Sequence, residues 1–465
     1  MRIKSLQWLG SFLGLLVLTM SIIGGESLDI GKISGIGSNQ TLISVKNPGS
    51  HNNQAFFSLD DIKDLTGYNL TFSADLETKI ENQPVLVIGT NSQYPAFNNT
   101  TLKSGCFWDE AAVSGAESVV VIDEKLAWDV FKRLDVVGET LELLGRKFKV
   151  IGVLCADDSL TGFLSDSGLA HVYIPAGTLC GLDKSSRITT LQIQNREPGL
   201  SGGNRMDTIN VLRKLGKSQE DYYIADLYVE NVLIGQKPRI LTFLAGIAII
   251  IILLQEAFRR VKELGIFVQS RCENDYWEDV LKNDSVLLAG RLFIILLLLV
   301  LMVLIWEWVS FDVYIPPEYL PKNLFDFSFY VDLFRKEIGE GFLHRGYIAP
   351  LLELRLNKIN SLSNLLFCGG LLLGLPVVWL SLRLSKWTGD VLHLLITPCL
   401  SFAAAMTLTA ITVLFSGMPL NVNGGDLAVV FSFIYIYSIR LLTKGRHGEG
   451  NEKMVSGPDV GADGV

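Results

Sequence analysis

The chain has 465 residues, of which 49% are apolar and only 19% are charged. Soluble proteins carry about 25% charged residues, so this composition argues against a fully soluble enzyme and excludes an intrinsically disordered chain. The 40 basic and 48 acidic side chains give a net charge of −8. That balance argues against a nucleic-acid-binding protein, because such proteins place Lys and Arg on the phosphates.

Six long apolar segments predict six membrane-spanning helices, since a span needs about 20 mostly apolar residues. The segments are 6–24, 240–258, 292–306, 362–382, 391–415 and 427–439. Their number favours spanning helices over the buried helices of a soluble core. We therefore predict an α-helical integral membrane protein with a large extracytoplasmic α+β domain.

The first segment has two interpretations, a cleaved signal peptide or an uncleaved anchor. Arg2 and Lys4 supply the basic start that both share. The apolar run is longer than the ~7–15 residues of a signal peptide, and residues 23–26 (IGGE) make a poor cleavage site. We favour the uncleaved anchor.

Basic residues predict the orientation, because cytoplasmic loops are enriched in Lys and Arg. If all six segments span, the basic clusters fall on one side of the membrane, and the loop 416–426 on the other side has no Lys or Arg. The clusters are Arg2 and Lys4; Arg259, Arg260, Lys262, Arg271, Lys282 and Arg291; Arg383 and Lys386; and Arg440, Lys444, Arg446 and Lys453. We expect a multi-pass protein of the cell membrane with both termini in the cytoplasm.

This orientation predicts the domain organisation. In chain order it is an anchor (1–25), an extracytoplasmic domain (26–238), two spans (239–309) around a cytoplasmic loop (256–291), an extracytoplasmic aromatic-rich loop (310–361), three spans (362–442) and a cytoplasmic tail (443–465).

The extracytoplasmic domain mixes strand and helix patterns. Predicted strands cover 84–88, 118–122, 171–174 and 188–194, a predicted hairpin joins 140–144 to 147–154 around Gly145 and Arg146, and predicted helices cover 123–131 and 205–216. Asp123 is the candidate N-cap of the first helix. The domain is therefore predicted to be α+β.

Residues 117–154 resemble the MacB-like core domain of FtsX/MacB-type ABC permeases. The matching pieces are a V-G-x-T-L turn at 137–141, a hairpin strand ending in V-I-G-V at 150–153, and a V-Y-I-P strand at 172–175. The order of one span, a large external domain and further spans also agrees. The resemblance implies a permease subunit that pairs with a second permease and with a separate cytoplasmic ATPase.

A second match follows the second span, where residues 259–266 read RRVKELGI. The family carries R-x-x-E-I-G-I there, near the ATPase, so the resemblance implies coupling roles for Arg260, Glu263, Leu264 and Gly265. Arg260 and Glu263 are spaced to pair on a helix, and Val261, Leu264 and Phe267 form an apolar stripe. The alternative is that these basic residues only fix topology and bind anionic lipid.

The coupling segment also departs from the family. Where the family commonly has a Gly-Ala turn, this chain has Arg271 and Cys272. The substitution puts coupling to an ATPase in question. So do the extra pair of spans and the 310–361 loop, which four-span family members do not have.

No motif predicts catalysis by this chain. Residues 199–203 (GLSGG) resemble an ABC signature and a nucleophile elbow, but no G-x-x-x-x-G-K-[ST] or H-E-x-x-H occurs, and an elbow Ser201 would need a His and an acid nearby. We expect no cofactor and no metal.

Three further features leave alternatives open. Cys106, Cys155 and Cys180 are an odd number of external cysteines, so one disulfide or none fits. The aromatic residues of 310–361 suit either a membrane interface or packing against the external domain. Gly-x-x-x-Gly pairs at Gly10/Gly14 and Gly370/Gly374 suit close helix packing or dimerisation.

Two functions follow. The first is an ABC permease subunit that couples ATP hydrolysis by its partner to movement of the external domain, for export or mechanotransmission, in contact with membrane lipid. The second is a non-transporting scaffold or sensor that binds an envelope protein. The sequence predicts neither the substrate nor whether the dimer is homo- or heteromeric.

Overall fold

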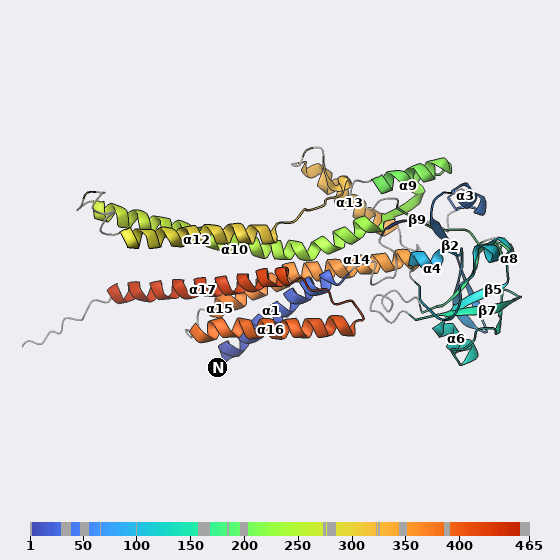
Figure 1. Ribbon diagram of the computed structural model, residues 1–465, viewed down its shortest axis with the longest axis horizontal. Helices are drawn as coiled ribbons and strands as arrows, with labels where there is room; N and C mark the ends of the chain where they lie inside the picture. Colours follow the sequence, from blue (N-terminus) through green and yellow to red (C-terminus); the bar gives the residue numbers. More distant parts are fainter. Residues whose placement is uncertain are drawn as a thin grey trace, which may run out of the picture.

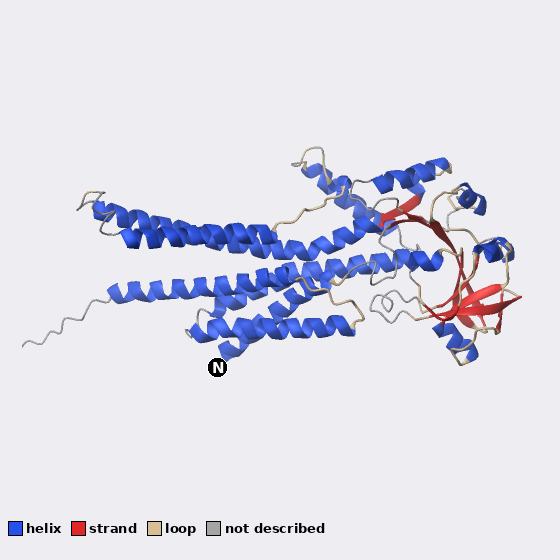
Figure 2. Ribbon diagram, in the orientation of Figure 1, coloured by secondary structure: helices blue, strands red, loops and turns tan. Residues whose placement is uncertain are grey.

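A computed structural model gives an elongated molecule, with long helices at one end and an α/β domain at the other (Figure 1). All strands gather in that domain (Figure 2). The structure describes residues 2–28, 39–46, 55–65, 67–98, 100–156, 168–183, 186–195, 203–272, 276, 285–321, 323, 326–343, 351–385 and 391–455. The Gly-rich motif at 199–203 lies outside these residues except for Gly203.

Within the described residues, six helices are long and apolar enough to cross a membrane, which confirms the predicted number of spans. They are α1 (Arg2–Thr19) with a π-helical turn (Met20–Gly24); α10 (Leu227–Cys272); α12 (Ser285–Val309); α14 (Leu351–Gly369), which continues through a π-helical turn (Gly370–Gly374) into α15 (Leu375–Ser385); α16 (Val391–Phe415); and α17 (Gly424–Val455).

Several helices extend beyond the predicted spans, among them α10, α14 and α17. The helix α10 starts at Leu227 and ends at Cys272, so the predicted loop 256–291 begins as helix. The helix α14 starts at Leu351, inside the predicted loop 310–361, and α17 runs to Val455, inside the predicted tail. Hydropathy detects only the apolar part of a helix, and the polar turns that continue it outside the lipid carry no such signal.

Small residues bring α1 close to the helix formed by α14 and α15. A Cβ on Gly14 would lie 2.8 Å from the backbone nitrogen of Val378, and one on Gly374 would lie 3.2 Å from Cα of Leu18. A Cβ on Gly370 would lie 2.7 Å from Ser21. Both predicted Gly-x-x-x-Gly pairs therefore serve helix packing within the chain.

The domain is built on a 10-stranded sheet with the order β10-β1-β9-β2-β3-β8-β5-β7-β4, and β6 pairs with β7. The strands are β1 (Gln40–Val45), β2 (Leu70–Ile80), β3 (Gln83–Thr90), β4 (Leu102–Gly105), β5 (Val119–Asp123), β6 (Thr140–Leu143), β7 (Arg146–Leu154), β8 (Ala170–Pro175), β9 (Thr190–Gln194) and β10 (Tyr222–Asp226). The pairs β3–β8 and β5–β7 are parallel, and the other pairs are antiparallel.

Short helices complete the α+β domain, as predicted. They are α3 (Leu59–Asp64), α4 (Tyr94–Asn98), α5 (Glu110–Ser114), α6 (Glu124–Phe131), α8 (Ala176–Leu182) and α9 (Gly203–Lys214). Asp123 caps α6, because its carboxylate accepts a hydrogen bond from the Leu126 backbone N–H at 2.7 Å. Separate buried clusters form around Phe148 and around Trp108.

One predicted turn is shifted by a residue. The β6–β7 hairpin turns at Leu144 and Gly145, whose φ angles are +52° and +74°, rather than at Gly145 and Arg146. Positive φ at both central residues matches the right-handed twist of the strands. Leu144 adopts it despite its side chain, so its identity gave no turn signal.

The external cysteines carry no disulfide. Cys106, Cys155 and Cys180 are all unpaired. Of the two arrangements left open by the sequence, the structure shows the one without a bridge.

Candidate functional site

A single helix connects the sheet to the far end of the molecule. The helix α10 begins directly after β10, the edge strand that pairs with β1. The Asp226 carboxylate accepts hydrogen bonds from the Tyr228 backbone N–H at 3.1 Å and from the Asn195 amide at 3.3 Å. Asn195 in turn accepts one from the Thr41 hydroxyl at 2.8 Å. The first turn of α10 is thus tied to three strands, and a movement of the helix must move the sheet edge.

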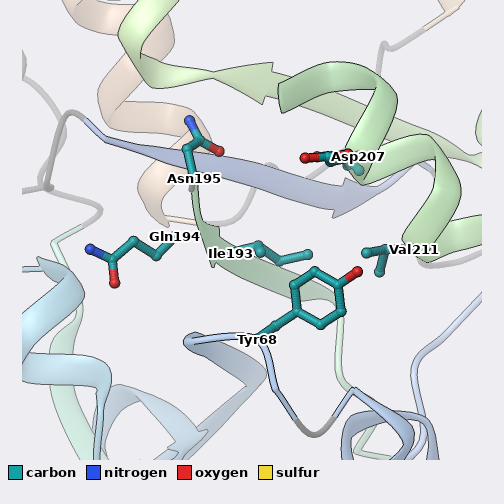
Figure 3. A pocket seen from close by; sticks show the side chains of 7 residues that line it. Tyr68, Ile193, Gln194, Asn195, Asp207 and Val211 are labelled. Atoms are coloured by element: carbon teal, nitrogen blue, oxygen red, sulfur yellow. The ribbon is translucent and has the colours of Figure 1, made fainter. Parts of the chain in front are cut away.

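A small pocket lies beside this junction, between β9 and α9 (Figure 3). It is lined by Tyr68, Ile193, Gln194, Asn195, Asp207, Thr208 and Val211. Its volume of about 20 Å³ holds about one water molecule. Small-molecule sites usually measure about 300–1,000 Å³, so this pocket is too small for a substrate.

The helix α14 runs beside α10 as a second connection between bundle and domain (Figure 1). Two polar contacts lock the pair together. The Asn360 amide donates to the Glu230 carboxylate at 3.0 Å, and the Lys237 ammonium donates to the Asn364 side-chain oxygen at 2.7 Å. We call these four residues the stalk lock.

The N-terminal end of α14 contacts the sheet through apolar side chains. Leu352 and Leu356 of α14 belong to the same buried cluster as Leu42 and Ala225, which face each other across β1 and β10. The bundle core therefore continues into the sheet, and α14 supports the strands from which α10 emerges.

A group of polar side chains lies further along the sheet. The Tyr94 and Tyr173 rings are 5.5 Å apart, and both residues are buried. Burial raises the pKa of Tyr173, and the positive charge of Arg355 on α14 opposes this shift. Burial also raises the pKa of Asp75 on β2 to about 6. The charge of Arg355 thus acts on groups inside the domain.

The loop after α12 contacts α10 at Gln236, next to Lys237 of the stalk lock. The Gln236 amide donates to the Tyr314 backbone carbonyl at 3.1 Å and accepts from the Tyr314 N–H at 3.2 Å. The Phe243 ring packs edge-on against Phe311 at 6.1 Å and Trp306 at 6.3 Å. We call the Gln236–Tyr314 pair the clasp.

The loop between α16 and α17 closes over the end of α1. The Asn423 N–H donates to the Glu26 carboxylate at 2.9 Å, and the Asn421 N–H donates to the Ser27 hydroxyl at 3.2 Å. Burial and the neighbouring Asp426 carboxyl raise the pKa of Glu26 to about 8. The α16–α17 pair is thereby attached to the end of the first span.

The predicted coupling residues lie together near the other end of α10. Arg260 contacts Glu256 at 3.1 Å and Glu263 at 3.6 Å, so the expected Arg260–Glu263 pair is present. Arg259 contacts Glu256 at 2.5 Å and Glu263 at 3.8 Å. We call these four residues the charged cluster.

The remaining coupling residues offer an open surface. Leu264 is half-buried, and a Cβ on Gly265 would meet nothing within 4 Å. Val261 and Ile266 are 50% and 58% exposed. Phe267, the last residue of the predicted apolar stripe, makes two cation–π contacts. The guanidinium carbon of Arg291 on α12 lies 4.1 Å from the centre of its ring, and that of Arg271 lies 5.7 Å from it. Arg271, which differs from the family pattern, therefore covers the end of the apolar stripe.

Sequence reasoning missed the stalk lock and the clasp. Glu230, Gln236 and Lys237 precede the apolar core of α10, and Asn360 precedes the apolar core of α14. The sequence signal that could have indicated them is a helical segment of mixed polar and apolar residues before each apolar span. Among the described residues, no group of three or more His, Cys, Asp or Glu is arranged to hold a metal ion.

Comparisons with known proteins confirm the family resemblance. Residues 13–221 match the family model of the MacB-like periplasmic core domain. The chain is 25% identical over 210 residues to the macrolide export ATP-binding/permease protein MacB of Shewanella sp. (strain W3-18-1), which covers 42% of this chain and 32% of that protein. It is 27% identical over 192 residues to the pyoverdine export ATP-binding/permease protein PvdT of Pseudomonas syringae pv. tomato, which covers 38% of this chain and 29% of that protein.

A third relative matches over a larger share of its length. The uncharacterized ABC transporter permease YknZ of Bacillus subtilis (strain 168) is 23% identical over 294 residues, covering 55% of this chain and 72% of that protein. The chain thus spans about a third of the MacB and PvdT proteins and about three quarters of YknZ.

Solved structures of the extracytoplasmic regions of such proteins are also similar. The periplasmic region of MacB from Actinobacillus actinomycetemcomitans has a TM-score of 0.34 at 22% identity, covering 42% of this chain and 92% of that one. The extracellular domain of YknZ has a TM-score of 0.32 at 19% identity, covering 40% and 100%.

Proposed function

We propose that this chain is the permease subunit of an ABC transporter of the MacB/FtsX type, working with a separate cytoplasmic ATPase. One observation carries the proposal. The continuous helix α10 joins the edge of the MacB-like domain to the charged cluster, 46 residues from end to end. The names of the relatives, as export ATP-binding/permease proteins and an ABC transporter permease, support the same class.

The proposed mechanism is mechanical. ATP binding by the ATPase draws two permease chains together, and α10 passes this motion outward. A helix rises about 1.5 Å per residue and keeps its backbone hydrogen bonds along the axis, so α10 acts as a rod about 69 Å long over its 46 residues. Pro238 lies inside it, where a proline removes a hydrogen bond and favours a bend. The stalk lock lies on the N-terminal side of that residue, at Glu230 and Lys237, and holds α10 against α14 there.

Each end of the rod has a separate task. At the cytoplasmic end, the charged cluster and the open surface at Leu264 and Gly265 receive the ATPase. At the outer end, Asp226 and its hydrogen-bond partners move β10 and β1. The domain then acts on a substrate or partner outside the membrane. In this arrangement both termini are cytoplasmic, and the chain itself carries out no catalysis.

One observation favours the scaffold or sensor as a second candidate. Arg271 and Arg291 both lie over Phe267, so side chains of the same protein cover the end of the apolar stripe. A surface that needs no partner there fits a permease homologue that has lost its ATPase.

Co-purification from the native host distinguishes the two candidates. The tagged full-length protein is extracted in mild detergent, and the co-eluting proteins are identified by mass spectrometry. The permease predicts a stoichiometric P-loop ATPase. Recovery of envelope proteins alone, with no ATPase in any detergent, would reject the permease and support the scaffold.

A charge reversal then tests the coupling residues. Glu263→Lys breaks the contacts to Arg259 and Arg260, and it should lower ATPase recovery or uncouple hydrolysis from function while the domain stays folded. Glu139→Lys is the matched control, because Glu139 is an exposed carboxylate paired with Arg133 in the extracytoplasmic domain. Equal activity of the Glu263→Lys variant and the wild type would remove the charged cluster from the mechanism.

A further inference from the structure

The segment between α12 and α14 has two parts that differ in the burial of their aromatic residues. Phe311 and Tyr314 pack on α10, as described above. The helix α13 (Phe327–Leu343) instead leaves aromatic side chains uncovered. The two interpretations of this loop, protein packing and a membrane interface, therefore apply to different segments of it.

The start of α13 is well defined. The Asp326 carboxylate accepts hydrogen bonds from the Ser328 N–H at 3.1 Å, from the Phe329 N–H at 3.4 Å and from the Ser328 hydroxyl at 2.6 Å. A capping carboxylate satisfies N–H groups that the first helical turn leaves free. The orientation of the following side chains is thereby set.

Two opposite faces of α13 are apolar. Phe329 and Leu333, one helical turn apart, are half-buried. On the other side, Phe327, Val331 and Phe334 are 80%, 48% and 66% exposed. Their i, i+4, i+7 spacing places these three side chains on one stripe, which we call the aromatic face.

Charged residues flank this face instead of interrupting it. Asp332 and Arg335 pair at 3.9 Å, and their side chains are 74% and 77% exposed. An amphipathic helix with charged flanks and a bulky apolar face is the pattern of helices that lie in a membrane interface.

The position of α13 fits the same surface. It lies beyond the end of α12, near the level at which α1 and α16 end on the side of the domain (Figure 1). Trp306 and Trp308, in the last turn of α12, are 48% and 68% exposed. Exposed tryptophans at the end of a span mark the interface between lipid and water, so the chain leaves α12 at the interface before it forms α13.

We propose that α13 is an interfacial anchor whose aromatic face lies in the outer leaflet of the membrane. The occupant of this face is lipid, because α13 follows the exposed tryptophans at the end of α12 and the exposed residues of the face are Phe and Val. The flanking pair carries no net charge, so zwitterionic headgroups suffice and no anionic lipid is required.

The anchor would give the clasp a fixed reference. The same loop holds Gln236 of α10 through Tyr314, and α13 begins 13 positions later at Phe327. A loop fixed to the membrane surface would keep this point of α10 at constant height while the rest of the helix moves. The lipid contact itself does not depend on the presence of an ATPase.

Spin-label accessibility tests the proposal in the full-length chain. The six cysteines are replaced by serine, and nitroxides are placed singly at 327, 331, 334, 332 and 335 in phosphatidylcholine nanodiscs. Labels at Leu297 on α12 and Trp128 in the domain, 47% and 57% exposed, supply the lipid and water references. We expect 327, 331 and 334 to match Leu297, with high oxygen and low nickel-chelate accessibility, and 332 and 335 to show severalfold more nickel access.

Two results would overturn the proposal. Nickel-chelate access at 331 and 334 equal to that at Trp128 would mean that the face is in water. Protection from both oxygen and nickel would mean that protein covers it.

A second measurement uses the unmodified chain, so it does not depend on the folding of the cysteine-free variant. Wild-type protein in nanodiscs containing a diazirine-tailed phosphatidylcholine is irradiated and digested. Adducts on the 327–334 peptide at a level comparable with α12 peptides support the anchor. Labelling of α12 with none on 327–334 would reject it.

Discussion

The two ends of α10 differ in how much of the protein surrounds them. Around the outer end, Asp226, Glu230, Gln236 and Lys237 make polar contacts with residues outside α10, and two of these contacts are with α14. Around the other end, the ion pairs of the charged cluster stay within α10 itself, and Val261 and Ile266 point outward.

The difference in contacts indicates a different role for each end of α10. Contacts with other elements make the outer end move together with the sheet and α14. Contacts within one helix fix only the local side chains, and they leave the surface available to a partner. In the proposed mechanism, the outer end would deliver a movement and the inner end would receive one.

The largest expected effect comes from glycine substitutions that separate packed from open helix surfaces. Gly14→Leu would force a side chain against the Val378 backbone, and overpacking of this kind costs about 1–3 kcal/mol or more. Gly265→Leu meets no neighbour. Thermal unfolding of both variants in detergent should show a large loss of Tm for the first and a wild-type Tm for the second.

A wild-type Tm for Gly14→Leu would show that α1 and α15 do not pack as described. Loss of ATPase recovery in the stable Gly265→Leu variant would sharpen the comparison, since the open surface would then matter for binding and not for folding.

The next largest effect tests the stalk lock by a double-mutant cycle. Glu230→Ala and Asn360→Ala each remove one partner of a partly buried hydrogen bond. A hydrogen bond to a charged group contributes about 1.5–3 kcal/mol, so the two substitutions should be non-additive by roughly that order. Additive losses of stability would mean that the two helices are not coupled at this point.

The pH dependence of stability tests the polar group inside the domain. Asp75 has a folded pKa of about 6, above its usual value of 3.8, so the folded state binds its proton more tightly than the unfolded state. The stabilising contribution is complete below pH 3.8 and is lost as the pH rises through 6. We expect the Tm to fall between about pH 4 and 6 more steeply in the wild type than in Asp75→Asn, measured by thermal unfolding in parallel. Identical slopes would contradict this assignment.

The smallest expected effect is at the charged cluster. Glu256→Gln removes ion pairs between partly exposed side chains on one helix, and such pairs contribute about 0.3–0.5 kcal/mol. The Tm should change little. A drop as large as that of Glu230→Ala would mean that the inner end of α10 is structurally tied down after all.

Hydropathy and strand patterns predicted most of the fold. The six spans, the strands β3, β5, β7, β8 and β9, and the Asp123 cap all follow from local sequence. The charged cluster was also predictable, because i,i+3 and i,i+4 spacing is a local property.

The stalk lock, the clasp and α13 were not predictable from local sequence. Glu230 and Asn360 are 130 positions apart in the chain, and a single polar residue beside a span does not indicate its partner. The Leu144 turn escaped for another reason, because leucine seldom adopts positive φ.

The most direct test of the central claim is a distance measurement across α10. In the cysteine-free chain, Trp128→Cys in the domain and Phe415→Cys at the outer end of α16 are spin-labelled, since both side chains are largely exposed. Pulsed electron resonance then compares the co-purified permease–ATPase complex with and without ATP. The account predicts a distance that changes with ATP in the wild type and stays constant in Glu263→Lys. A complex that hydrolyses ATP while the wild-type distance does not change would contradict the claim that α10 transmits movement to the domain.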